Sequence, residues 1–466
     1  MGRKTYIFSR AICNHLPAQC IVKDMVWHIN EIGGISMFQT IELQPGIHLH
    51  IRPTDQFKTV NFSFKFKQLL TNQSASERSV LSNVLLHSNE LFPSNSAFRS
   101  HLDELYGTIM YLDSSKKGSD HSVTLLAESV NDQYLSTGGV LDQVINLMQT
   151  VLFSPNLEQG TFKESIVKRE KDTVIQRIES IYDDKTRYAQ QRLVELMRPN
   201  NPASIGANGT IKDVNAITKE SLFKAYKKML EEDELDIYVV GDVDVEEMTA
   251  KLKQAFPFKA RSKKQKNVHE NIEHKTAEKN KVNEQQEMKQ GKLHIGYNTP
   301  VTFTHPDFPK MQITNGIFGG YPHAKLFLNV REKESMAYYV SSSFSSAYGL
   351  VFVLAGIDAS KQEKAVRLID EQLEAMKNGE ISKNEIDQTV AMLKNQLKEA
   401  LDSARGQIEI YDQYKDLDEK FSVDSWVEKW TSVTKEDIQE MAKSINKELV
   451  YFLSGKEELS HEGASL

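Results

Sequence analysis

The sequence predicts an α/β (α+β) fold made of two homologous sheet-and-helix halves, because one segment pattern occurs twice. Residues 217–242 and 433–456 both open on an apolar residue and Thr-Lys-Glu, continue as an amphipathic helix, and end in a short apolar strand closed by glycine. Thr218 and Thr434 are good N-cap residues for the two helices. The shared order of cap, helix and strand indicates an internal duplication.

A second, looser repeat supports the duplication. Residues 98–129 and 326–357 each run from a helix, through a tyrosine, to two alternating strands joined by a polar turn. Two repeats in the same order are harder to attribute to chance than one. The alternation of polar and apolar residues over 46–68 further predicts an opening pair of strands.

A polar segment separates the two copies. It is dense in Lys, Glu, Asn and Gln, and it has too few large apolar residues to offset the entropy lost on ordering. We therefore expect a solvated linker there. The predicted division of the chain is an irregular extension or translated leader over 1–36, an N-terminal half over 37–258, the linker over 259–290, a C-terminal half over 291–457 and a tail over 458–466.

The first residues have two possible interpretations. Residues 1–36 show little periodicity and lack the continuous apolar core of a signal peptide. Codons for the two glycines before Met37 can spell a purine-rich ribosome-binding site, so Met37 is a candidate start and 1–36 a translated leader. The alternative is a genuine, irregular N-terminal arm.

Composition excludes several classes of function. The chain has 466 residues and a net charge of −7, which gives no reason to expect nucleic acid as a partner. No apolar run approaches the roughly 20 residues that span a bilayer. The two cysteines, Cys13 and Cys20, lie near the N-terminus, and a long remainder without cysteine fits a reducing, cytoplasmic location.

A degenerate zinc motif lies in the N-terminal half. An inverted zincin motif, His-x-x-Glu-His, places two imidazole ligands and a catalytic carboxylate on one helical face. Its three positions here hold Asn83, Leu86 and His87. One imidazole cannot hold a catalytic zinc, and leucine cannot take a proton from water. A frame shifted by four residues offers His87 and Glu90 but puts Leu91 at the second ligand position.

This arrangement resembles the pitrilysin/insulinase family of inverted-zincin peptidases, in its two-domain subunit form. In that family a distal glutamate ligand follows in a helix, within a pattern that REKDTVIQRIES (169–180) matches. Glu170 then stands for a supporting glutamate, and Arg177 falls where the ligand should be. A cation there would oppose zinc. The inverted zinc motif and the distal ligand position both lack residues needed to bind zinc. The resemblance therefore implies a duplicated metallopeptidase-like fold that has lost its zinc site.

A third family landmark is retained in the C-terminal half. The family pattern Leu-Arg-Glu-Lys-x-Gly-Leu-Ala-Tyr corresponds to VREKESMAY, which supplies Arg331 and Tyr338, with Ser335 in place of the glycine. The resemblance implies that this pair faces the zinc and holds the substrate carbonyl, where it could stabilise a developing oxyanion. The alternatives are a buried ion pair of Arg331 with Glu332 or a neighbour, and simple core packing of Tyr338.

The resemblance implies a non-catalytic subunit of a zinc peptidase-like heterodimer. A zinc-bearing homologous subunit would supply metal, water and base, and this chain would hold no cofactor of its own. It would complete the chamber, bind an extended peptide by strand addition, and contribute Arg331 and Tyr338. Two alternatives stay open: a stand-alone peptide-binding or scaffold protein, and an active zinc metallopeptidase with a site rearranged around His87, Glu90 and Glu170.

Overall fold

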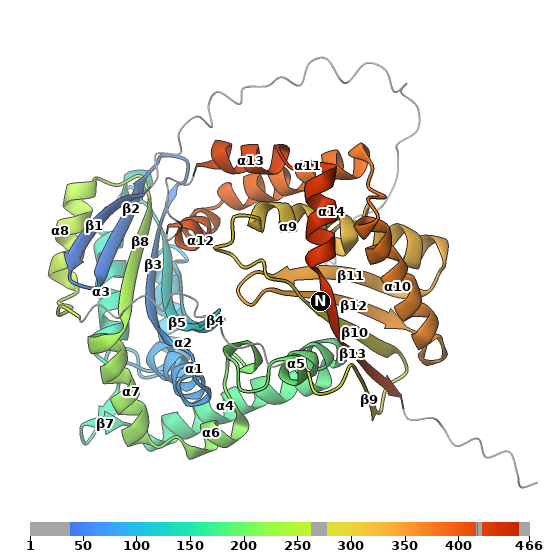
Figure 1. The fold of residues 1–466 in the computed structure, drawn as a ribbon. Helices are drawn as coiled ribbons and strands as arrows, with labels where there is room; N and C mark the ends of the chain where they lie inside the picture. Colours follow the sequence, from blue (N-terminus) through green and yellow to red (C-terminus); the bar gives the residue numbers. More distant parts are fainter. Residues whose placement is uncertain (1–37, 262–276, 416, 418–421, 456–466) are drawn as a thin grey trace, which may run out of the picture.

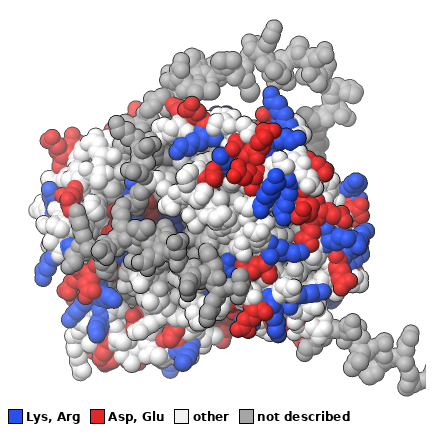
Figure 2. All heavy atoms as spheres, in the orientation of Figure 1, with Lys and Arg blue, Asp and Glu red and all other residues white. Residues whose placement is uncertain are grey.

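The computed structural model describes residues 38–261, 277–415, 417 and 422–455, and it contains two large β-sheets with helices packed against both (Figure 1). The expectations for 1–36 and 458–466 lie outside the described residues. Within the described ranges, no helix is both long enough and apolar enough to cross a membrane. On the face drawn in Figure 2, acidic and basic side chains are interspersed.

The N-terminal half carries the first sheet. Its elements in chain order are β1 (Gln39–Gln44), β2 (Ile47–Pro53), β3 (Thr59–Leu69), α1 (Asn72–His87), α2 (Asn95–Glu104), β4 (Ile109–Lys117), β5 (Asp120–Val130), η2 (Asp132–Tyr134), α3 (Val140–Phe153), β6 (Leu157–Glu158), β7 (Thr161–Phe162), α4 (Glu164–Asp183), α5 (Lys185–Met197), η3 (Pro202–Ser204), α6 (Ile211–Ala216), α7 (Lys219–Glu232), β8 (Glu234–Gly241) and α8 (Val245–Ala255). The strand order of the sheet is β1-β2-β8-β3-β5-β4.

The C-terminal half carries the second sheet. Its elements are β9 (Lys281–Gln286), β10 (Gly291–Asn298), α9 (Phe308–Asn315), the π-helices η4 (Gly316–Gly320) and η5 (Leu326–Lys333), β11 (Ala337–Ser345), β12 (Leu350–Ile357), η6 (Ala359–Lys361), α10 (Gln362–Lys377), α11 (Lys383–Leu401), α12 (Ala404–Tyr414), α13 (Val423–Thr431), α14 (Lys435–Ser444) and β13 (Asn446–Gly455). The strand order is β11-β12-β10-β13-β9.

The two sheets share one topology, which confirms the predicted duplication. The series β4-β5-β3-β8-β2 corresponds strand for strand to β11-β12-β10-β13-β9. In both series the last pair is parallel and the other pairs are antiparallel. Both predicted caps also form: Thr218 and Thr434 each accept a hydrogen bond of 3.2 Å from the main-chain N–H three residues on.

The predicted linker was too long at both ends. Residues 281–286 form β9, which pairs in parallel with β13 as β2 pairs with β8, so the second half begins before residue 291. At the other end Arg261 is buried and donates to the carbonyl oxygens of Leu230 and Asp233 at the end of α7. Both segments are polar and were therefore assigned to the linker. An edge strand and a helix-capping arginine need few apolar residues.

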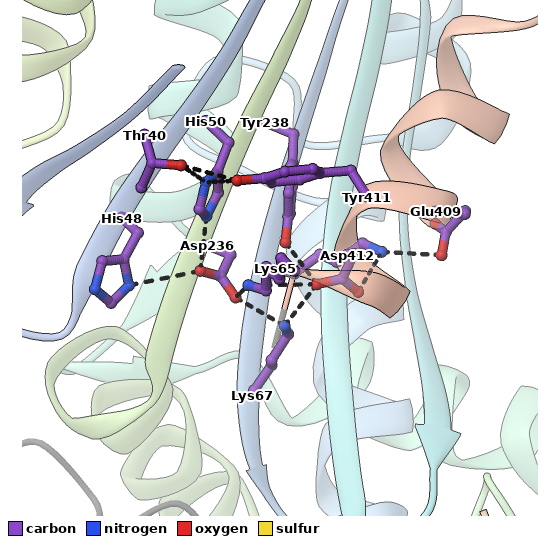
Figure 3. A network of polar contacts seen from close by, with 11 residues as sticks. Thr40, His48, His50, Lys65, Lys67, Asp236, Tyr238, Glu409, Tyr411 and Asp412 are labelled. Atoms are coloured by element: carbon purple, nitrogen blue, oxygen red, sulfur yellow. Dashed lines mark hydrogen bonds and ion pairs between the residues drawn. The ribbon is translucent and has the colours of Figure 1, made fainter. Parts of the chain in front are cut away.

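The predicted opening strand pair was half right. Residues 47–53 and 59–69 are strands, but β8 lies between them and pairs with both. Their alternation places one side of each strand in the apolar core under α1, α3 and α8. The other side carries His48, His50, Lys65 and Lys67, which Figure 3 shows gathered around Asp236 and Asp412.

Each half lends one helix to the sheet of the other half. Helix α5 packs on β10 and β13 through Ala189, Leu193 and Met197, so these two strands are buried on both faces. Helix α12 packs on β3 and β8 of the first sheet, where Ile408 contacts a small apolar cluster. The two crossings join the halves into one body (Figure 1).

A buried charge network lies between α12 and the first sheet (Figure 3). Lys67 Nζ lies 2.7 Å from Asp236 of β8 and 2.8 Å from Asp412 of α12. Lys65 Nζ lies 3.0 Å from Asp412, and Lys415 pairs with Asp236. Burial raises the pKa of Asp412, but the neighbouring lysines outweigh it and hold that pKa well below its usual range. Both carboxylates are therefore ionised and paired across the two halves.

Candidate functional site

The degenerate motif lies on the buried face of α1. Asn83 is buried, and within the described residues its side-chain nitrogen has no hydrogen-bond partner. Leu86 packs against the apolar core of the first half. His87, the last residue of the helix, has Nδ1 3.2 Å from Glu170 Oε2 on α4. The structure therefore brings His87 and Glu170 together.

Glu170 is occupied as an ion-pair partner. It is buried and lies between His87 and Arg169, whose guanidinium is 2.7 Å from the other carboxylate oxygen. Burial raises the pKa of Glu170, but the hydrogen bonds from His87 and Arg169 outweigh it and lower the pKa below its usual value. Arg177 lies two helical turns further along α4 and is exposed. It offers no ligand atom for a metal.

These residues do not fit a catalytic zinc. Three protein ligands and an open position are needed, whereas this region offers one imidazole that already contacts a carboxylate. Glu90 is exposed, and it does not combine with His87 and Glu170 into a group of closely spaced ligand atoms. The arrangement therefore gives no support to a metal site rearranged around those three residues.

The one group of closely spaced ligand atoms in the described ranges lies elsewhere, at His48, Glu234 and Asp236. It belongs to the charge network under α12. Lys67 and Lys415 both contact the second carboxylate oxygen of Asp236. Two ammonium groups at that position oppose a divalent cation, so Asp236 is held there as an ion-pair partner of lysines from both halves.

Arg331 and Tyr338 lie together in a surface pocket. The pocket has a volume of about 450 Å³, and besides these two residues its lining includes Ser335, Asp358 and Lys361. The side chain of Arg331 is 40% exposed and Tyr338 is 69% exposed. Sequence reasoning missed Asp358 and Lys361, because they come from the connection after β12 and no local motif places them here.

The contacts of Arg331 and Tyr338 match neither of the alternatives, a buried ion pair of the arginine and core packing of the tyrosine. Arg331 Nε is 3.7 Å from Glu332, but both side chains are substantially exposed, and ion pairs of this kind contribute little to stability. The guanidinium also stacks over the ring of Phe327, with 4.7 Å to its centroid. Tyr338 does not pack in a core. The pair is thus positioned by the protein and presented to solvent.

Three irregular features of the main chain position Arg331 and Tyr338. Arg331 lies in a π-helix, a helix type that is rare and often found at functional sites. Ser335, where the family has glycine, adopts a left-handed φ of 46°. Tyr338 is the extra residue of a β-bulge, because Ala337 and Tyr339 pair with the successive β12 residues 357 and 356. A bulge re-aims its side chain away from the regular alternation of the strand.

The corresponding region of the first half has an ordinary α-helix and an unbroken strand register. In the repeat that aligns 98–129 with 326–357, Gly107 corresponds to Ser335 and Met110 to Tyr338. Helix α2 is an ordinary α-helix, and β4 pairs with β5 without a break in register. Met110 is buried. The π-helix and the β-bulge are therefore specific to the half that carries the arginine and the tyrosine, whereas the left-handed turn recurs at Gly107.

Comparison with known proteins identifies relatives of this chain. The profile of the "Peptidase M16 inactive domain" matches residues 216–393. The chain is 39% identical to the "Probable inactive metalloprotease YmfF" of Bacillus subtilis over 413 residues, which cover 88% of this chain and 96% of that protein.

Solved structures show the same fold. A conserved protein from Enterococcus faecalis is 33% identical, with a TM-score of 0.83 over 90% of this chain and 99% of that chain. A peptidase M16 inactive domain from Pseudomonas fluorescens, 17% identical, has a TM-score of 0.72 over 90% of this chain and 98% of that chain. With its residues unsuited to zinc and its extensive identity to an inactive relative, this chain belongs to the pitrilysin/insulinase (M16) peptidase family, as an inactive homologue.

Proposed function

We propose that this chain is the non-catalytic subunit of a two-chain zinc peptidase-like assembly. It shapes the peptide-binding chamber and supplies Arg331 and Tyr338 to a zinc-bearing homologous partner, in the cytoplasm. The observation that carries the proposal is the contrast between the two sites: the zinc positions offer a single imidazole, which already contacts Glu170, whereas the arginine and tyrosine remain exposed in one pocket.

The geometry of the retained pair supports a role toward an external substrate. A guanidinium and a phenol that converge on one pocket can donate hydrogen bonds to a peptide carbonyl, and these bonds strengthen as negative charge develops on its oxygen. Strand β11, which carries Tyr338, is the edge strand of its sheet, so an extended peptide could lie along it. The partner would supply zinc, activated water and the general base.

Reconstitution with the partner tests the proposal. The full chain is co-purified with a homologous chain from the same organism that carries an intact His-x-x-Glu-His motif, and cleavage of a quenched fluorescent peptide is measured. We expect Arg331→Ala and Tyr338→Phe each to lower kcat/KM by about 10²- to 10³-fold, the size found for single oxyanion-stabilising donors. Arg367→Ala and Tyr134→Phe, at exposed positions away from the pocket, are the matched controls.

Each outcome has a distinct meaning. Unchanged cleavage in both pocket variants, with the complex intact, would show that the pair is a relic and that the chain serves as a scaffold. Stoichiometric zinc together with peptide cleavage by the lone chain would refute the non-catalytic assignment.

A further inference from the structure

A second pocket adjoins β11 at its other end. It has a volume of about 390 Å³, and β11 contributes Ser342, Ser343 and Phe344 to it. The remaining lining comes from α9, η4, α11 and α12, with further residues beside them. No lining residue carries a charge, and four carry side-chain amides: Gln312, Asn315, Gln396 and Gln413. We call it the amide pocket.

Hydrogen bonds within the protein orient three of these amides. Trp430 Nε1, which can only donate, lies 2.9 Å from Gln312 Oε1. Tyr321 donates to Gln396 Oε1 at 2.8 Å. In each case the amide oxygen is engaged, and the amide NH₂ has no protein acceptor among the described residues.

Asn315 is held in the same way. Ser342 Oγ lies 2.9 Å from Asn315 Oδ1, so this amide oxygen is also engaged. Its NH₂, too, has no protein acceptor within the ranges that the structure describes. The amide pocket therefore presents several hydrogen-bond donors in fixed positions.

The lining selects an uncharged ligand that carries both an acceptor and donors. An ion would lose its hydration without gaining a counter-charge, which is costly. A planar carboxamide can accept from the fixed NH₂ groups and donate to the Ser343 hydroxyl or to the Gln413 amide. Phe308, Phe344 and Leu393 supply apolar surface for its faces and its methylene groups.

The amide pocket shares its strand with the pocket of Arg331 and Tyr338. Tyr338 and Ser343 are five residues apart on β11, so an extended chain covers the separation in roughly 15–20 Å. One peptide lying along this edge would contact the arginine–tyrosine pair and, about five residues away, the amide pocket.

We propose that the amide pocket is a second peptide subsite, which accepts an Asn or Gln side chain of the peptide that reaches Arg331 and Tyr338. The inference rests on the proposed function, because it takes an extended peptide as the ligand. It adds a specificity: among otherwise equal peptides, the chain selects those with a carboxamide side chain at this distance.

Direct binding to the full chain tests the subsite. The probes are a fluorescein-labelled Thr/Ala peptide with one central Gln, and its copy with Leu in place of Gln. A length of about twelve residues lets the central side chain reach the pocket. Fluorescence anisotropy should show the Gln peptide binding roughly five- to tenfold more tightly, the size of one net hydrogen bond.

A near-isosteric substitution locates the effect. Gln396→Glu replaces the donor NH₂ by a charged acceptor and should abolish the preference for Gln. Gln388→Glu makes the same change at an exposed position on the same helix, α11, and should leave the preference intact. Thermal unfolding of both variants shows whether either one has lost its fold.

Several results would overturn the subsite: equal affinity for both peptides, no binding of either peptide, or a preference that persists in folded Gln396→Glu. These results leave the proposed function standing if Arg331→Ala still lowers cleavage in the reconstituted complex. Unchanged cleavage in Arg331→Ala, with a Gln preference present, would instead refute only the role of the arginine.

Discussion

The two helices that cross between the halves rest on chemically different surfaces. Helix α5 meets the second sheet through apolar side chains that cover His294, whose Nδ1 lies 3.2 Å from Gln190, and through a buried ion pair of Arg198 with Glu448 where the helix ends. Helix α12 meets the first sheet through Asp412 and the lysines that also bind Asp236. The duplicated topology therefore fixes where a helix crosses, whereas the contact beneath the helix can be mainly apolar or can carry a network of paired charges.

The two halves also differ around the candidate site. Gly107 and Ser335 occupy corresponding turns, both with left-handed φ, yet only the second turn leads into a bulged strand and an exposed tyrosine. The first half has kept regular elements around an emptied zinc motif. The second half keeps irregular backbone where the arginine and tyrosine meet.

The largest expected effect comes from breaking the charged crossing. Asp412→Asn leaves Lys65 and Lys67 buried with one carboxylate fewer, and such losses typically cost about 3–5 kcal/mol of unfolding free energy. Glu409→Gln removes a partner of the same Lys65, but Glu409 is 56% exposed, so the cost should stay below about 1 kcal/mol. Urea unfolding at pH 7 measures both. Equal, small losses would mean that the network does not stabilise the crossing.

The apolar crossing should respond to acid through His294. Burial under α5 lowers its pKa to about 3 from an ordinary value of 6.5. The unfolded state therefore binds the additional proton below pH 6.5, and stability falls as the pH drops from 6.5 toward 3.

Removing that titration should flatten the pH dependence. Between pH 6 and pH 4, wild type should lose on the order of 1 kcal/mol per pH unit more than His294→Gln. His305→Gln, at a partly exposed histidine, is the control and should behave like wild type. Identical slopes for wild type and His294→Gln, in urea unfolding at each pH, would contradict a buried neutral histidine.

The sequence predicted the topology better than it predicted the crossings. Periodicity and caps located the repeated helix–strand units, because those signals are local. The charge network was not predictable: Lys65 and Asp412 are 347 residues apart, and a polar strand face is usually a solvated one. Strand β9 was missed because its Lys, Glu and Gln side chains resemble a linker, although its main chain pairs with β13.

The sequence predicted which residues form the candidate site, but not the backbone geometry that positions them. The motif around Arg331 and Tyr338 named the pair through a family resemblance, and the substitution of Ser335 for glycine was visible in the sequence. The bulge at Tyr338 and the π-helix before it depend on how β11 meets β12 and how η5 packs against β11. Neither has a local sequence signal.

The smallest expected effect tests whether the turns at Gly107 and Ser335 both require a left-handed backbone conformation. Ser335→Gly relieves a left-handed conformation that costs an L-residue about 1–2 kcal/mol, while glycine loses more chain entropy on folding, so a net gain of roughly 0.5–1 kcal/mol is expected. Gly107→Ser, the reciprocal change at φ 72°, should lose a similar amount, since no neighbouring atom lies within 4 Å to add a clash. Thermal and urea unfolding measure both variants. If Ser335→Gly also lowers cleavage by the reconstituted complex without lowering stability, the serine itself helps to position Tyr338, and the second turn differs from the first in function as well as in sequence.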